Sequence, residues 1–95
     1  MADILRVLVV DDSEDDCSLI IRKLRNSGFD PEWERVDTHS EMKKALGKKQ
    51  WDVILCDYKM PNFSAPAALK LAQEINPNIP FIIVSGAIGE ETAVE

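Results

Sequence analysis

Two short apolar runs in this chain end abruptly on aspartate. Val7–Val10 is followed by Asp11 and Asp12. Val53–Cys56 is followed by Asp57. Such continuous apolar runs predict strands buried on both faces, as in the parallel sheets of α/β proteins, where ligands bind beyond the carboxyl ends of the strands. If the two strands are neighbours, three carboxylates share one edge, and their repulsion of roughly 1 kcal/mol per pair at 4 Å in water favours a bound cation.

Length and composition fit one small domain. The chain has 95 residues, of which 45% are hydrophobic and 29% are charged. A net charge of −6 argues against direct binding of nucleic acid. The two cysteines, Cys17 and Cys56, do not make a disulfide framework, so we expect buried, reduced thiols in the cytoplasm. The apolar run near the N-terminus is too short to span a membrane and lacks the features of a secretion signal.

Strand and helix patterns alternate along the chain. We expect strands at residues 4–10, 32–36, 52–56 and 80–84, with an amphipathic helix in each interval. The helix starts are marked by capping residues: Ser13, Thr38 and Ser64. The second strand is polar, which is typical of a sheet edge. The alternation predicts an α/β fold with the order βαβαβαβ.

The segment after the fourth strand predicts the start of another helix. Ser85–Gly89 resembles a loop, and the acidic stretch Glu90–Glu95 suits a first helical turn. We therefore expect residues 1–95 to form a single domain that is truncated at its C-terminus.

An ordered set of residues carries a resemblance to a known family. Asp11-Asp12 after the first strand, Asp57 with Met60-Pro61 after the third, and Ser85-Gly86 after the fourth resemble the receiver domain of two-component response regulators. The resemblance runs collinearly over the whole chain. It implies a flavodoxin-like, doubly wound parallel sheet with strand order 2-1-3-4, lacking the family's fifth strand and last helix.

The resemblance also implies roles for particular residues. Asp57 would be the phosphoacceptor, taking a phosphoryl group from a sensor histidine kinase or a phosphotransfer protein. Mg²⁺ would be held by Asp12, by Asp57 and by the backbone carbonyl of Lys59, with Asp11 acting mostly through water. Such an oxygen-rich set suits an ion that prefers six oxygen ligands. Ser85 would be the switch hydroxyl, and no separate substrate would be turned over.

One departure from the family keeps an alternative open. The lysine and the aromatic residue that the family places on its fifth strand are missing, so the chain could be a receiver-like interaction module that no longer switches on phosphorylation. The fourth strand would also form an exposed apolar edge at Phe81–Val84. Such an edge invites strand pairing, and we expect a homodimer or a larger oligomer.

Three other classes fit less well. A haloacid-dehalogenase-type phosphatase needs a second carboxylate two residues after its nucleophile, where Lys59 stands. A dinucleotide-binding protein needs a glycine-rich turn in place of Asp11-Asp12. A serine hydrolase needs a G-x-S-x-G motif around Ser85, which is absent.

Overall fold

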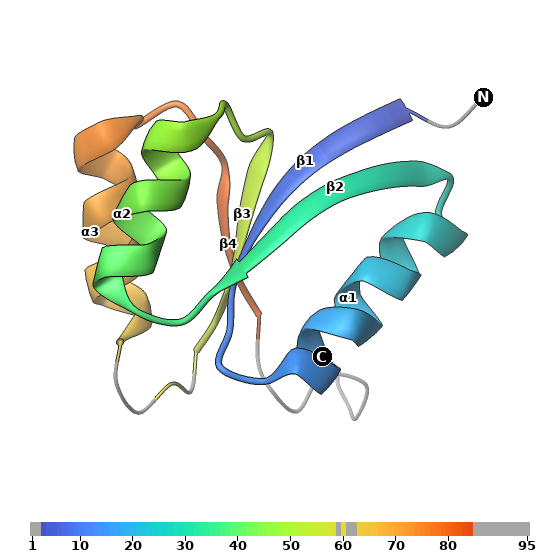
Figure 1. The fold of residues 1–95 in the computed structure, drawn as a ribbon, viewed down its shortest axis with the longest axis horizontal. Coiled ribbons are helices and arrows are strands. Elements are labelled where there is room, and N and C mark those ends of the chain that lie inside the picture. The colour runs from blue at the N-terminus through green and yellow to red at the C-terminus, as the bar shows by residue number, and fades with distance from the viewer. Residues whose placement is uncertain (1–2, 59, 61–62, 85–95) are drawn as a thin grey trace.

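The chain folds into a parallel sheet covered by helices on both faces (Figure 1). The computed structural model describes residues 3–58, 60 and 63–84. The elements are β1 (Asp3–Val10), α1 (Glu14–Asn26), β2 (Phe29–Val36), α2 (His39–Lys48), β3 (Val53–Asp57), α3 (Ala65–Ile75) and β4 (Phe81–Val84). All three strand pairs are parallel, and the strand order is β2-β1-β3-β4. The predicted fold class and strand order are confirmed.

The sheet separates two apolar clusters. α2 and α3 pack together on one face, and α1 lies on the other (Figure 1). Side chains of β1 alternate between the two, because successive residues of a strand point to opposite faces. Leu8 and Val10 join the cluster under α2 and α3, whereas Val7 and Val9 join the cluster under α1. All four are fully buried, which confirms the prediction of a strand covered on both sides.

Each helix begins at the capping residue that the sequence indicates. The cap oxygens accept from backbone N–H groups of the first turn: Ser13 from Asp16 at 3.2 Å, Thr38 from Glu41 at 3.1 Å and Ser64 from Ala67 at 3.2 Å. These bonds satisfy donors that have no partner within the helix. The starts of the three helices are therefore set locally.

β2 is longer than expected. It begins at Phe29 rather than Glu32 and pairs with β1 along its whole length, with Pro31 opposite Leu5. Proline cannot donate to a sheet ladder and is tolerated on edge strands. The predicted edge position of this strand is confirmed.

Some expectations fall outside the described residues. These are the roles of Lys59 and Ser85, and the helix start expected at Glu90. Among the residues that the structure describes, no helix is long and apolar enough to cross a membrane.

Candidate metal and phosphoacceptor site

The neighbouring strands β1 and β3 deliver their aspartates to the same edge of the sheet. Val10, the last residue of β1, pairs with Cys56 of β3. Asp11 and Asp57 therefore follow at the same level, and the loops that leave β1 and β3 lie on one edge of the sheet (Figure 1).

The three predicted carboxylates come together. One carboxylate oxygen from each of Asp11, Asp12 and Asp57 lies within 4.8 Å of the other two. Asp11 and Asp57 are only 3% and 6% exposed, whereas Asp12 is open to solvent. The cluster thus has two buried carboxylates and one on the solvent side, and the predicted convergence of the three side chains is confirmed.

The environment of Asp11 favours its protonated form. Burial raises the pKa of this carboxyl from 3.8 to about 6, and the nearby charges of Asp57, Asp16 and Asp12 add to the rise. The backbone N–H of Ser13 opposes the rise by donating to the Asp11 carboxylate at 2.9 Å. A carboxylate in such a place gains from a cation that offsets the neighbouring charges.

The donor set fits Mg²⁺. This ion binds oxygen at about 2.0–2.1 Å in octahedral geometry, so its ligand oxygens lie about 3 to 4 Å apart, and it usually retains several waters. Carboxylate oxygens within 4.8 Å of one another are close enough to surround one such ion. The exposed side of Asp12 leaves room for those waters.

The two cysteines lie outside the acidic cluster as buried thiols. Both are free and buried, as the sequence predicts. Burial raises the pKa of the Cys56 thiol to about 12 and that of Cys17 to about 11, so both remain protonated at neutral pH. The Cys56 thiol donates to the backbone carbonyl of Asp57 at 3.3 Å and therefore helps to pack the end of β3.

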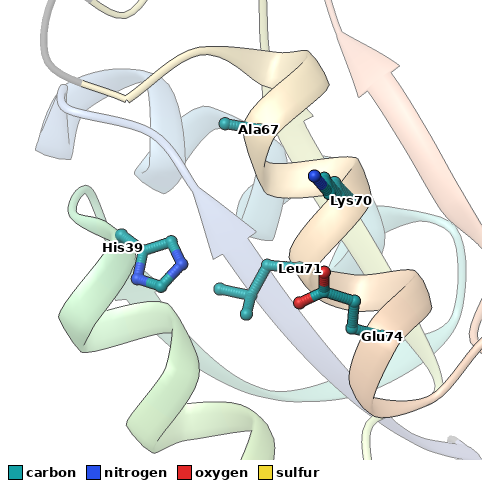
Figure 2. A pocket seen from close by; sticks show the side chains of 5 residues that line it. All are labelled: His39, Ala67, Lys70, Leu71 and Glu74. Carbon is teal, nitrogen blue, oxygen red and sulfur yellow. The ribbon is translucent and has the colours of Figure 1, made fainter.

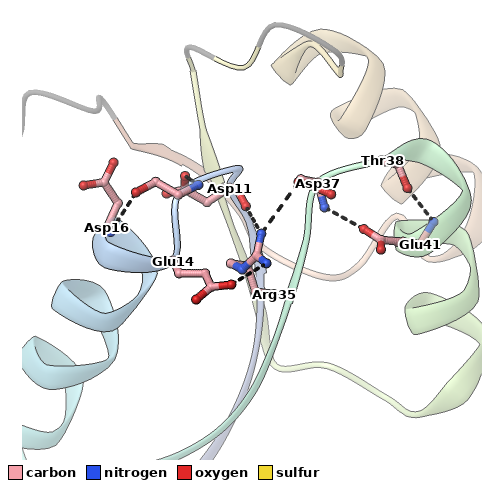
Figure 3. A network of polar contacts seen from close by, with 8 residues as sticks. Asp11, Glu14, Asp16, Arg35, Asp37, Thr38 and Glu41 are labelled. Carbon is pink, nitrogen blue, oxygen red and sulfur yellow. Dashed lines mark hydrogen bonds and ion pairs between the residues drawn. The ribbon is translucent and has the colours of Figure 1, made fainter.

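Arg35 is a neighbour of the site that sequence reasoning missed. Its guanidinium lies between the loop after β1 and the loop after β2 (Figure 3), and it donates to the backbone carbonyl of Asp11 at 3.1 Å. The signal in the sequence is a lone arginine near the end of an otherwise acidic strand. Its position beside the site depends on the register of β2 against β1, which the sequence pattern does not give.

A separate hollow lies between α2 and α3 (Figure 2). It has a volume of about 230 Å³ and is lined by His39, Ala67, Lys70, Leu71 and Glu74. None of the three clustered carboxylates lines it, so the acidic cluster is not part of this hollow.

Comparison with protein families agrees with this geometry. The family model described as the response regulator receiver domain matches residues 7–95. This chain belongs to the response regulator receiver domain family. The match includes both apolar runs that lead into aspartate and all three carboxylates of the cluster.

Curated relatives of this receiver domain include transcriptional regulatory proteins. The chain is 33% identical over 89 residues to the protein ZraR of Salmonella typhimurium, with 94% of the chain and 20% of the relative covered. It is 30% identical over 93 residues to ZraR of Escherichia coli strain K12, with 98% of the chain and 21% of that protein covered. The chain therefore spans about a fifth of the length of these relatives.

Solved receiver structures share the fold. A response regulator receiver protein from Pseudomonas putida superposes with a TM-score of 0.72 at 23% identity, covering 90% of this chain and 70% of that one. The receiver domain of the Francisella response regulator 1452 superposes with a TM-score of 0.69 at 27% identity, and the match covers 90% of this chain and 69% of that one. The receiver domain of the sensor histidine kinase PA1611 from Pseudomonas aeruginosa superposes with a TM-score of 0.70 at 20% identity, and the match covers 90% of this chain and 71% of that one. That structure was solved with magnesium coordinated in its active-site cleft.

Proposed function

We propose that this receiver domain is a phosphoacceptor in a two-component phosphorelay and that Asp57 is the acceptor. One observation carries the proposal. Asp57 is the last residue of β3. One of its carboxylate oxygens lies within 4.8 Å of a carboxylate oxygen of Asp11 and of one of Asp12. Three acids at the carboxyl edge of a parallel sheet suit a cation-assisted reaction of an anionic nucleophile with an anionic phosphoryl group.

The proposed reaction is a phosphoryl transfer. A carboxylate oxygen of Asp57 attacks the phosphorus of a phosphohistidine on a sensor kinase or a phosphotransfer protein. The phosphorus–nitrogen bond breaks, its electron pair stays on the imidazole nitrogen, and Asp57 becomes an acyl phosphate. Water later hydrolyses the acyl phosphate and restores the carboxylate. No separate substrate is turned over, so the domain acts as a signalling module rather than an ordinary enzyme.

We assign a Mg²⁺ site to the same edge of the sheet. Asp12, Asp57 and the backbone carbonyl of Lys59 would bind the ion directly, and Asp11 would contact it through water. When bound, the ion offsets the negative charge of the nucleophile and of the incoming phosphoryl group. Ser85 is proposed as the switch hydroxyl, which would hydrogen-bond the phosphoryl group and bias a two-state loop.

The proposed partners are proteins. A sensor histidine kinase or a phosphotransfer protein would dock at the carboxyl edge of the sheet, and no direct contact with nucleic acid or membrane is proposed. We also propose self-association along β4, where Ile82 and Ile83 are each about half exposed. The buried, reduced thiols of Cys17 and Cys56 fit a cytoplasmic location.

Intact-mass measurement tests phosphoryl transfer. The protein is incubated with acetyl phosphate and Mg²⁺, and the expected result is the gain of one phosphoryl group that disappears when the metal is chelated. Asp57→Asn should abolish the gain. Asp52→Asn is the matched control, because it changes an aspartate just before the other end of β3 and should behave as wild type.

No mass gain in folded wild-type protein, at any Mg²⁺ concentration, would contradict the proposed function. It would instead favour a receiver-like interaction module that does not switch on phosphorylation.

Thermal unfolding tests the metal site independently of phosphorylation. Mg²⁺ should raise the Tm of the wild type, because a ligand that binds the folded state alone stabilises it by mass action. Asp12→Asn should lose most of this rise. Asp15→Asn, which changes an exposed acid in the first turn of α1, should retain it. An equal rise in both variants would exclude Asp12 as a ligand.

A further inference from the structure

The guanidinium of Arg35 connects three segments around the carboxylate site. One of its nitrogens donates to the backbone carbonyl of Asp11 at 3.1 Å and lies 3.7 Å from the carboxylate of Asp37. Another nitrogen lies 3.5 Å from the carboxylate of Glu14. Figure 3 shows the guanidinium between the start of α1 and the loop that follows β2. A single side chain therefore contacts the loop after β1, the first turn of α1 and the loop after β2.

Strand register explains this position. Arg35 is paired with Val9, whose side chain belongs to the apolar cluster under α1. Residues paired directly in neighbouring strands present their side chains to the same face of the sheet. Arg35 therefore extends on the α1 side, two residues before the level of Asp11. Its side chain is 26% exposed, so its contacts are partly shielded from water.

Arg35 contributes one of three restraints on Asp11. The backbone N–H of Asp11 donates to the carbonyl of Val36 at 2.9 Å, and its carboxylate accepts from the N–H of Ser13 at 2.9 Å. Arg35 holds the remaining polar group, the carbonyl of Asp11. That carbonyl belongs to the peptide bond that leads into Asp12, so its orientation sets the direction in which Asp12 leaves β1.

We propose that Arg35 is a positioning residue for the carboxylate site. By holding the Asp11 carbonyl it orients the peptide that carries Asp12 and keeps both acids in place to bind Mg²⁺ with Asp57. This inference rests on the proposed metal-dependent function. Partners that orient the ligands of a metal commonly determine its affinity.

The positioning effect of Arg35 and its positive charge have opposite effects on the affinity of the site for Mg²⁺. A positive charge near the site disfavours a second cation, so loss of charge alone would tighten Mg²⁺ binding. Loss of the bond to the Asp11 carbonyl would loosen the ligands and weaken binding. The carboxylates of Glu14 and Asp37 already offset the charge of Arg35, which favours the positioning effect.

The experiment measures the dissociation constant of Mg²⁺ by isothermal titration calorimetry. Arg35→Met retains an apolar stem and removes the guanidinium, and we expect it to raise the Kd about tenfold, at the low end of the effect of removing such orienting partners. Arg35→Lys keeps the positive charge but lacks the planar guanidinium, so it should raise the Kd for Mg²⁺ by a smaller factor than Arg35→Met does. The matched control is Arg6→Met, which removes a comparable ion pair, 3.5 Å from Asp52, before β3 begins.

A second readout separates positioning from a general loss of structure. In phosphorylation by acetyl phosphate, Arg35→Met should need about ten times more Mg²⁺ for half-maximal rate, in line with its expected Kd. The rate at saturating Mg²⁺ should change much less. A purely structural defect would lower the amount of active protein without moving the half-saturation point.

An unchanged or lower Kd in folded Arg35→Met would overturn the proposal. If Arg35→Met does not fold, Arg35→Lys is measured in its place, and a wild-type Kd for Mg²⁺ in that variant would overturn the role of Arg35.

The role of Arg35 and the proposed function can be told apart by the behaviour of the wild-type protein. Wild-type protein that neither binds Mg²⁺ nor accepts phosphate would overturn both, whereas normal wild-type behaviour with an unaltered Arg35 variant would overturn only the role of Arg35.

Discussion

Asp11 shows how burying a carboxylate among other acids destabilises the fold. Its carboxylate is buried beside two other acids, and the backbone N–H of Ser13 donates to it. Burial and the neighbouring charges outweigh this bond, so the folded protein holds a proton there more tightly than the unfolded chain does. A group with a raised acidic pKa destabilises the fold at pH values above that pKa, and the cost disappears as the pH falls towards the unfolded value. For Asp11 this window lies between a pH of about 6 and 3.8.

Asp11→Asn should therefore stabilise the metal-free protein at pH 7.5. The rise from 3.8 to about 6 corresponds to a cost of up to about 3 kcal/mol at neutral pH. Asparagine removes the charge but keeps an oxygen that can accept from Ser13. At pH 4.5 the difference in free energy of unfolding between Asp11→Asn and the wild type should shrink to about 1 kcal/mol or less, because Asp11 in the folded wild type is then protonated. Urea denaturation with EDTA at both pH values measures the difference.

Asp30→Asn serves as the control for this measurement. Asp30 is an exposed aspartate in β2, away from the cluster, and its replacement should change stability little at either pH. If Asp11→Asn were no more stable than wild type at pH 7.5, the electrostatic cost described for Asp11 would be wrong.

The carboxylates could be predicted from sequence, but their neighbour Arg35 could not. Asp11, Asp12 and Asp57 directly follow buried apolar runs, and such runs identify the ends of parallel strands. Arg35 reaches the site only because it is opposite Val9 in the pairing of β1 with β2. Periodicity gives the existence of a strand and leaves its register open.

At the scale of single elements, the helix starts are strongly encoded. Thr38 begins α2 by accepting from the N–H of Glu41, and the Glu41 carboxylate accepts from the N–H of Asp37 at 3.1 Å. This pair of bonds fixes the loop between Arg35 and α2, so the same cap also supports the neighbourhood of the site (Figure 3).

Thr38→Ala should destabilise the protein by about 1 kcal/mol, because the first turn of α2 loses an acceptor for its N–H groups. Ser40→Ala is the matched control. Ser40 is an exposed residue within α2, and alanine there should be neutral or slightly stabilising. Chemical denaturation of both variants measures the difference. Equal stabilities for the two would show that the Thr38 cap contributes nothing.

The start of β2 was the least predictable boundary. Residues 29–31 include a proline and do not show the alternation of apolar and polar residues that is typical of a strand. They nevertheless pair with β1. Pairing with β1 supplies backbone hydrogen bonds that override the weak local preference of these residues for a strand. Capping side chains act within a few residues, which explains why helix starts are easier to predict than this strand.

In the part of the chain that the structure describes, β4 lies at the edge of the sheet opposite β2. Among the residues that the structure describes, it pairs only with β3. Ile82 is 50% exposed and Ile83 is 48% exposed. An apolar strand with one unpaired edge can add a strand from another chain.

We predict that residues 1–95 self-associate in sedimentation experiments at tens of micromolar. Ile82→Lys should shift the protein towards monomer, because a charge on an edge strand opposes pairing. Leu19→Lys is the control, since Leu19 is similarly exposed but lies on α1. A clean monomer of the wild type would contradict the prediction. Equal dissociation by both variants would place the contact elsewhere.

Chemical trapping would locate the acyl phosphate that we propose at Asp57. Borohydride reduces the carboxyl carbon of an acyl phosphate to an alcohol, so a phosphorylated aspartate becomes homoserine and can be located by peptide fragmentation. Trypsin should release the peptide 50–59, which contains Asp52 and Asp57, and the separate peptide 7–22, which contains Asp11 and Asp12. We expect homoserine at position 57 alone, and only when Mg²⁺ is present. Homoserine at position 11, 12 or 52, or none in protein that gained phosphate, would contradict the assignment of Asp57.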